Sequence, residues 1–296
     1  MFTARYTFLF ILALGTIAIS AQSSYATSFV KRVLTHIRSE VHKDIPYGKH
    51  PLQVMDIYTP DERKKQERPV LIFIHGGAWF TGDKKSHDDK AHFYNRNDII
   101  LVNINYRLAP QNPHPSQAED TATAIKWVHD NIHKYGGDPK RIHLSGHSAG
   151  AHIAALIGTD ERYLNEKGLS FASLKSVIPV DTASFDLNER MDKGGNFISR
   201  SIKKNFGEDK SKLEDASPAY HAENKKDFPR FLIFTTAKRP AAAMQSMKFS
   251  TTLNKSNGHS DVHIILKLSH GEMNEAMQDP HHIMSKLILD LIKDED

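Results

Sequence analysis

Hydrophobic side chains gather in short, β-branched runs that alternate with helix-length segments along most of the chain. Several runs are continuously apolar, as expected for strands that are covered on both faces. The predicted strands are Leu52–Tyr58, Val70–Ile74, Ile99–Asn105, Ile142–Leu144, Ser176–Val180, Phe231–Thr235 and Val262–Leu268. The predicted helices are Ser116–Tyr135, Ala149–Gly158, Ile198–Phe206, Ala242–Ser256 and Pro280–Lys293. This alternation predicts an α/β fold with helices on both faces of a sheet.

Residues 27–296 are predicted to form a single domain, because the alternation continues to the end of the chain without a repeat or a low-complexity tract. The segment 162–217 is less regular, with mixed polarity and the pair Gly194-Gly195. We therefore expect this segment to carry an excursion or a lid rather than a separate domain.

The N-terminal segment 1–26 has the features of a cleavable signal peptide. Arg5 precedes an apolar run, Phe8–Ile19, that is too short to cross a bilayer comfortably. Small residues follow this run and offer cleavage after Ala26, or alternatively after Ala21. A membrane anchor that stays attached is the competing interpretation. The pattern favours export, and hence a secreted or periplasmic protein with no stable membrane insertion after signal removal.

Composition excludes several classes of chemistry. The chain has no cysteine, which excludes disulfides, thiolate nucleophiles, zinc ribbons and iron–sulfur clusters. Lys and Arg number 39 against 35 Asp and Glu, a formal net charge of +4, and the basic residues form no long block. A nucleic-acid partner is therefore not expected.

One short motif has the pattern of a nucleophilic serine. Gly146-His147-Ser148-Ala149-Gly150 lies between a predicted strand and an Ala-rich helix. A serine hydroxyl is a poor nucleophile unless it is held exposed beside a base, and a sharp strand-to-helix turn provides that exposure. The crowded backbone of such a turn requires small residues two before and two after the serine, as Gly146 and Gly150 are. A glycine-rich turn at the edge of the sheet is the alternative interpretation.

A second motif supplies candidate oxyanion donors. His75-Gly76-Gly77-Ala78-Trp79 follows the predicted strand Val70–Ile74. Backbone N–H groups of consecutive small residues can approach an oxygen closely and stabilise the oxyanion that forms when a serine attacks a carbonyl. The expected donors are drawn from Gly76, Gly77, Ala78 and, at the start of the next helix, Ala149. We expect His75 to orient this loop, and Trp79 and Phe80 either to line a pocket or to be buried.

These motifs resemble the esterase branch of the α/β-hydrolase superfamily. The resemblance rests on the segments His75–Trp79, Asn103–Pro110, Tyr135–Ile142 and Ser145–His152. The most similar groups are the feruloyl-esterase-like carboxylesterases, the hormone-sensitive-lipase-like esterases and the kynurenine formamidases. The resemblance implies a mostly parallel sheet of about eight strands, a serine esterase or amidase, and no metal or organic cofactor.

In such proteins the general base comes last in the chain, after the final strand. His270 follows the predicted strand Val262–Leu268 and is the candidate base, because a neutral imidazole can accept a proton near neutral pH. Its position separates it from four other histidines near the C-terminus, namely His259, His263, His281 and His282. Most of the remaining histidines are expected to be solvated.

The acidic member of the triad is the open question. The resemblance places it after the strand Phe231–Thr235, but Lys238 and Arg239 stand there instead. One hypothesis is that the acid has moved to the end of the preceding strand, at Asp181, with Asp186 as the second choice. The other is that the triad is incomplete, because a cation cannot stabilise an imidazolium.

Together these features predict a serine carboxylesterase that acts on small ester substrates through an acyl-enzyme intermediate. Two alternatives stay open: an amidase or arylformamidase that uses the same site, and a catalytically impaired binding protein with the hydrolase fold.

Overall fold

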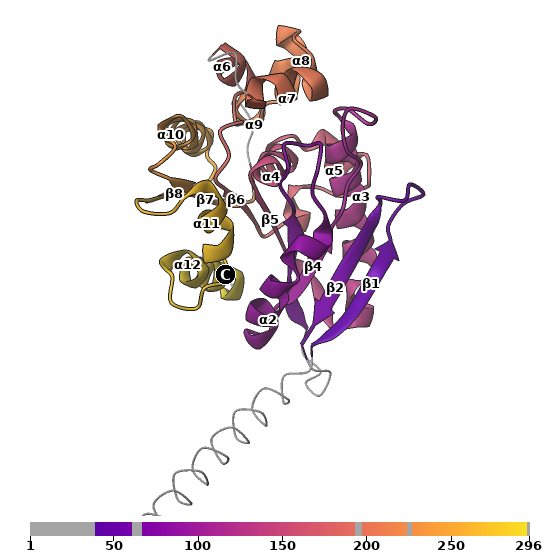
Figure 1. The fold of residues 1–296 in the computed structure, drawn as a ribbon. Helices are drawn as coiled ribbons and strands as arrows, with labels where there is room; N and C mark the ends of the chain where they lie inside the picture. The colour runs from indigo at the N-terminus through magenta and orange to yellow at the C-terminus, as the bar shows by residue number, and fades with distance from the viewer. Residues whose placement is uncertain (1–38, 61–66, 193–196, 224–226, 295–296) are drawn as a thin grey trace, which may run out of the picture. The chain divides into compact units, whose positions relative to one another are not determined.

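The computed structural model of the protein describes residues 39–60, 67–192, 197–223 and 227–294, and the sheet at its centre has eight strands (Figure 1). The strands are β1 Glu40–Pro46, β2 Val54–Thr59, β3 Arg68–Ile74, β4 Ile100–Ile104, β5 Gly137–His147, β6 Ser176–Val180, β7 Arg230–Thr236 and β8 Ser260–Ile265. Their order in the sheet is β1-β2-β4-β3-β5-β6-β7-β8. Only the pairs β1–β2 and β2–β4 are antiparallel among these neighbours, so the predicted mostly parallel sheet is confirmed.

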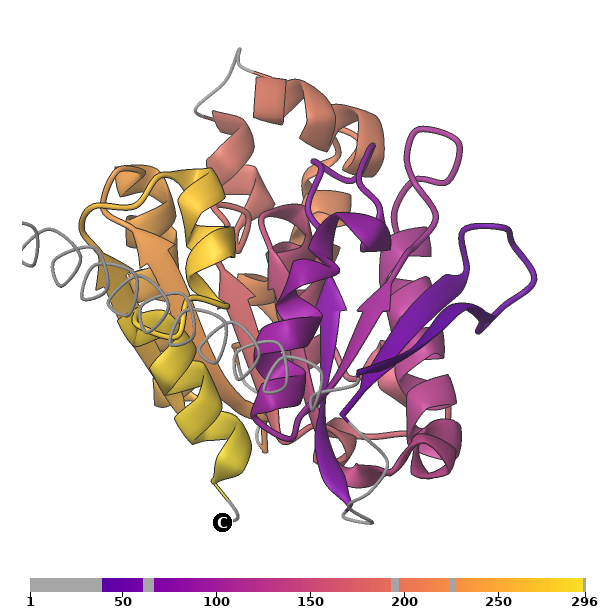
Figure 2. The same cartoon turned by 60° about the horizontal axis from the view of Figure 1, so that its bottom comes forward.

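Helices cover both faces of this sheet. They are α2 Asp89–Arg96, α3 Ser116–Asn131, α4 Ala149–Thr159, α5 Arg162–Asn165, α6 Leu187–Asp192, α7 Phe197–Phe206, α8 Lys210–Asp215, α9 Pro218–His221, α10 Pro240–Lys255, α11 His270–Ala276 and α12 Ile283–Lys293. Short 3-10 turns are η1 Lys84–His87, η2 Ile132–Tyr135 and η3 Phe171–Ser173. Figure 2 shows α2 and α12 on the same side of the sheet, with α3 on the other.

Strand β3 shows why the apolar runs are continuous. All of its residues are buried. Ile72 packs into the core that contains α3, α4 and α10, whereas its neighbours Leu71 and Phe73 pack into the core that contains α2, α11 and α12. Because successive side chains point to opposite faces, a strand between two helical layers needs apolar residues at every position.

Strands and strand ends that carry polar residues were harder to predict from sequence than the buried apolar runs. Strand β1 was not expected, because it is an edge strand whose side chains are mostly exposed. Strand β5 is longer than the predicted Ile142–Leu144, because its first residues are polar and only partly buried. Strand β6 has the predicted bounds, Ser176–Val180.

The segment 162–217 is not one continuous excursion, because β6 lies within it and takes a central place in the sheet. After β6 the chain forms α6, α7, α8 and α9 before it returns to the sheet as β7. In Figure 1 the helices α6, α7 and α8 lie together at one end of the sheet.

The described residues belong to one compact unit, which spans Ser39–Asp296. The predicted signal segment, 1–26, lies outside the described residues. Within the described part of the chain, no helix combines the length and the apolar character that a membrane crossing requires.

Candidate active site

Ser148 lies at the sharp turn between β5 and α4. Its backbone has φ 58° and ψ −117°, a conformation that L-residues seldom adopt and that occurs at such nucleophile turns. A Cβ on Gly146 would lie 2.4 Å from a backbone atom of Gly150, and a Cβ on Gly150 would lie 2.1 Å from the Ile74 carbonyl oxygen. Both glycines are therefore required by the close approach of the backbone on each side of the serine.

His270 lies directly opposite this serine. Its Nε2 is 3.0 Å from the Ser148 hydroxyl oxygen, which is hydrogen-bonding distance. His270 is the first residue of α11, and Ser269 caps that helix by accepting the N–H of Glu272. The His147 ring packs 4.4 Å from the His270 ring, and its Nε2 lies 2.8 Å from the His270 carbonyl oxygen. The serine turn itself thus helps to hold the histidine in place.

Asp181 lies on the other side of His270, immediately after β6. Its Oδ2 is 2.5 Å from His270 Nδ1, and its Oδ1 accepts the Thr236 N–H at 3.1 Å. Burial raises the pKa of Asp181, but the hydrogen bond from His270 and the charge and hydrogen bond of Arg239 outweigh burial and hold the pKa at about 2. Asp181 is therefore a carboxylate throughout the neutral and mildly acidic range.

Arg239, at the position where an acid was expected, contacts this same carboxylate. It is the residue before α10, and its Nη1 lies 2.7 Å from Asp181 Oδ2. The same nitrogen is 2.8 Å from the Asp181 carbonyl oxygen and 2.7 Å from His270 Nδ1. A cation does follow β7, but it pairs with a carboxylate that the end of β6 supplies.

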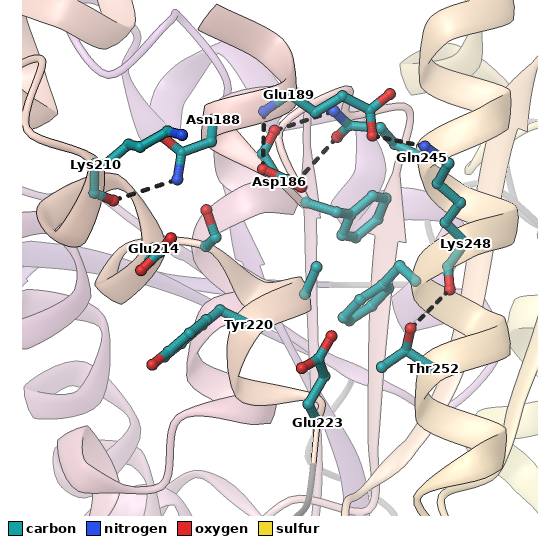
Figure 3. A pocket seen from close by; sticks show the side chains of 14 residues that line it. Asp186, Asn188, Glu189, Lys210, Glu214, Tyr220, Glu223, Gln245, Lys248 and Thr252 are labelled. Atoms are coloured by element: carbon teal, nitrogen blue, oxygen red, sulfur yellow. Dashed lines mark hydrogen bonds and ion pairs between the residues drawn. The ribbon is translucent and has the colours of Figure 1, made fainter.

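Asp186, the second choice for the acid, lies elsewhere. Its Oδ1 accepts the N–H of Glu189 at 2.9 Å in the first turn of α6, and its backbone forms two hydrogen bonds with Gln245 of α10. It lines a separate cavity of about 680 Å³ between α6, α8, α9 and α10 (Figure 3). Tyr220 and Glu223 line the same cavity. The structure therefore brings Asp181, and not Asp186, to His270.

The loop of candidate oxyanion donors lies beside the serine. A Cβ on Gly76 would be 3.0 Å from the His147 carbonyl oxygen and 3.1 Å from Ser148 Cβ, so the two segments touch. Gly77 has φ 119° and Ala78 has φ 51°, both in the left-handed region that small residues tolerate best. Ala149 is the first residue of α4 and follows the serine directly.

His75 holds this loop in place through its contacts with Tyr106. Its ring stacks on Tyr106 at 4.3 Å, and the Tyr106 hydroxyl donates to the His75 carbonyl oxygen at 3.0 Å. Burial lowers the pKa of His75 to about 4, so its ring is neutral at pH 7. Trp79 is buried and donates to His152 at 3.3 Å, whereas Phe80 is only partly buried.

The expectation that most other histidines are solvated is wrong for several of them. His75, His143, His147 and His152 are buried, and burial lowers their pKa values to about 4, 3, 3 and 3 respectively. Each lies in or next to a central strand or in α4, where tertiary packing encloses it. In the described part of the chain, no group of three or more His, Cys, Asp or Glu side chains is placed to hold a metal ion.

The sheet order, the serine turn after β5 and the histidine after β8 define the class of the protein. Esterase B from Lactobacillus rhamnosis shares the fold with a TM-score of 0.72 at 18% sequence identity, over 94% of this chain and 95% of that one. The protein therefore has the α/β-hydrolase fold, as the sequence motifs implied.

The particular family follows from the sequence. The BD-FAE family model matches residues 55–253, which is more than half of the chain. The chain belongs to the BD-FAE family.

Curated relatives are similar over stretches of different length. The probable isoprenylcysteine alpha-carbonyl methylesterase ICMEL1 of Oryza sativa subsp. japonica is 30% identical over 257 residues, which cover 82% of this chain and 59% of that protein. The arylacetamide deacetylase of Bos taurus is 41% identical over 120 residues, 39% of this chain and 29% of that protein. The chain spans only part of the length of three plant relatives named as probable methylesterases, between 24% and 59%.

Proposed function

We propose that the protein is a serine carboxylesterase that cleaves small carboxylic esters through an acyl-enzyme intermediate. The observation that carries the proposal is the 3.0 Å contact between the Ser148 hydroxyl and His270 Nε2 at a turn that exposes the serine. The Asp181 contact to His270 Nδ1 supports it, because a carboxylate there fixes the imidazole tautomer that can accept a proton.

The reaction has two halves that use the same groups. Ser148 Oγ attacks the ester carbonyl carbon while its proton moves to His270 Nε2, and the carbonyl oxygen becomes an oxyanion. Backbone N–H groups drawn from Gly76, Gly77, Ala78 and Ala149 stabilise that oxyanion. Collapse breaks the bond to the alcohol, which leaves with the proton from Nε2. Water then attacks the acyl-enzyme by the same route, releasing the carboxylic acid and restoring Ser148.

Labelling with a fluorophosphonate probe tests this proposal. The probe phosphylates an activated serine, so the folded protein should be labelled and the Ser148→Ala variant should not. Ser145→Ala is the matched control. Ser145 lies two residues before the end of β5, is buried, and its hydroxyl donates to the Ile178 carbonyl oxygen at 2.8 Å. Labelling that persists in Ser148→Ala would contradict the assignment of the nucleophile.

An amidase or arylformamidase activity at the same site is the second candidate. The similarity to an arylacetamide deacetylase favours it, since the name of that relative denotes cleavage of an amide. The difference lies in the leaving group: an amine must be protonated by His270 as it departs, whereas an alkoxide leaves more readily. Turnover of an aryl acetate compared with that of an N-formyl aromatic amine separates the two activities.

A catalytically impaired binding protein is the third candidate, suggested in the sequence by Lys238 and Arg239. The contact between Arg239 and Asp181 weakens that argument, because the cation pairs with a carboxylate instead of replacing one. The same labelling experiment decides: folded protein that is not labelled at all would favour the binding protein.

We also propose that the protein is exported by cleavage of the segment 1–26. N-terminal sequencing of the protein recovered outside the cytoplasm tests this proposal. A mature chain that begins after Ala26 or Ala21 is expected, and a full-length chain in the membrane fraction would support a retained anchor instead.

A further inference from the structure

Arg239 contacts two members of the proposed triad at once. Its Nη1 lies 2.7 Å from Asp181 Oδ2 and 2.7 Å from His270 Nδ1. The Asp181 side chain is fully buried, whereas 28% of the Arg239 side chain is exposed. We propose that Arg239 is a positioning residue, which aims the Asp181 carboxylate at His270 and, through its own positive charge beside His270 Nδ1, extends the activity to lower pH. This inference rests on the function proposed above.

The hydrogens of Arg239 match the acceptors of Asp181. A guanidinium Nη carries two hydrogens and accepts none. One is donated to Asp181 Oδ2 and the other to the Asp181 carbonyl oxygen, at 2.7 and 2.8 Å, so Nη1 is fully used. His270 Nδ1 then carries its own hydrogen and donates it to Oδ2 at 2.5 Å. Nε2 is left without a hydrogen, facing Ser148, which is the state that a general base needs.

The same contacts contain a competing arrangement. If Asp181 lost its charge or turned away, Arg239 could donate to His270 Nδ1 across the same 2.7 Å. Nδ1 would then be an acceptor, the ring hydrogen would sit on Nε2, and the ring could no longer take the proton of the serine. Arg239 therefore supports the reaction only while Asp181 is a carboxylate, so the charge of Asp181 decides which arrangement forms.

Arg239 is one of the groups that preserve that charge. Burial raises the pKa of Asp181, and the hydrogen bond from His270 together with the charge and hydrogen bond of Arg239 outweigh it. Removal of Arg239 would leave a buried carboxylate with weaker support, so its pKa would rise. Removal of Arg239 would also take a positive charge away from His270, whose Nδ1 lies 2.7 Å from Arg239 Nη1, so the ring would accept a proton more readily and activity in acid would be lost at a higher pH than in the unaltered protein.

Other charged or titratable groups around this cluster do not replace Arg239. Arg190 of α6 lies close enough for its charge to oppose that of Arg239. Burial lowers the pKa of His147, on β5, to about 3, so it is neutral beside His270. Glu272 of α11 accepts the Ser269 N–H at 2.6 Å. Lys238 is exposed, and its backbone N–H donates to Thr236.

The pH dependence of kcat/KM for an aryl acetate tests the role of Arg239. In Arg239→Met we expect kcat near neutral pH to fall roughly ten-fold or more with KM changed less than about two-fold, and the acidic limb to move up by about one pH unit. Arg239→Lys keeps the charge, so its acidic limb should stay close to that of the unaltered protein. Lys238→Met removes the same charge one residue away and should leave the profile unchanged.

A measurement without turnover separates this inference from the proposed function. In Ser148→Ala, the hydrogen between His270 Nδ1 and Asp181 should give a far-downfield proton resonance that disappears in Asp181→Asn. Adding Arg239→Met, or Arg239→Gln if the Met variant does not fold, should raise the pH at which this resonance changes position, because the ring then accepts its second proton more readily. An acidic limb and a resonance that do not move in these variants, or that move equally in Lys238→Met, would overturn the role of Arg239. Absence of esterase activity with a shifted resonance would overturn the function alone.

Discussion

The Ser148 hydroxyl and the His270 imidazole lie 3.0 Å apart although 122 residues separate them in the chain. Two segments of the chain form this contact. The turn between β5 and α4 holds the serine, and the first residue of α11 is the histidine. His147 links the two directly, because its ring packs against His270 and bonds to the carbonyl oxygen of that residue.

This contact predicts how activity depends on pH. A protonated imidazole cannot accept the serine proton, so kcat/KM should fall as the pH drops below neutrality. Asp181 does not cause that fall, because its pKa is held at about 2 and it remains ionised. Initial rates on an uncharged ester between pH 5 and pH 9 check the prediction, and a profile that stays flat down to pH 5 would argue against His270 as the base.

Substitution of the two candidate acids should have very different effects. Asp181→Asn removes the charge beside His270 Nδ1 and favours the wrong tautomer, so kcat should fall by roughly 10³–10⁴-fold. Asp186→Asn is the matched control, since the Asp186 side chain accepts the Glu189 N–H at the start of α6 and lines a separate cavity. Its kcat should stay within about two-fold of the unaltered protein. The reverse order of effects would move the acid to Asp186.

The buried histidines predict a loss of stability in acid. The pKa of His143 is lowered by burial from 6.5 to about 3, so the unfolded chain binds a proton between these values that the folded chain does not. The free energy of unfolding should therefore be highest above pH 6.5 and fall as the pH drops through this window.

His143→Gln isolates the contribution of one such residue. Glutamine can keep a hydrogen bond to the Ser176 hydroxyl, which lies 2.8 Å from His143 Nδ1, but it does not titrate. The change in unfolding free energy between pH 7 and pH 5, measured with urea, should shrink by about 1–2 kcal/mol in this variant. An identical pH dependence in both proteins would show that His143 does not titrate on unfolding.

The serine turn should not tolerate a larger residue at Gly150. A Cβ there would lie 2.1 Å from the Ile74 carbonyl oxygen, so Gly150→Ala must displace backbone atoms of β3 or α4. We expect the free energy of unfolding to fall by about 1–3 kcal/mol or more. Gly271→Ala is the control, because a Cβ at Gly271, within α11, meets nothing within 4 Å. Equal melting temperatures for the two variants would contradict the close approach.

Much of the fold could be predicted because its strands are buried on both faces. Strand β6 and the start of α4 follow directly from continuous apolar runs and a small-residue turn. Strand β1 could not be found in this way, since an edge strand that faces solvent carries no apolar pattern. Helix α11 was missed because it is short, with only Met273 and Ala276 buried.

The candidate site was predictable where a residue has a local reason for its place. Gly146 and Gly150 mark the serine turn through backbone crowding, which sequence spacing reveals. Arg239 has no such local pattern: its contact with Asp181 joins residues 58 positions apart and depends on how β6 and β7 pair. The burial of His143 likewise comes from the helices that cover β5, and a single polar residue in a short apolar run does not predict that it will be buried.

Strands β6 and β7 run parallel and side by side, with Val180 opposite Phe234. The loops that follow these two strands therefore meet at His270. Here the loop after β6 supplies the carboxylate, Asp181, and the loop after β7 supplies its counterion, Arg239. A search for the acidic residue that considered only the loop after β7 would find Lys238 and Arg239 and conclude that the triad is incomplete. In this fold the loops after β6 and β7 should therefore be considered together when the acid is sought.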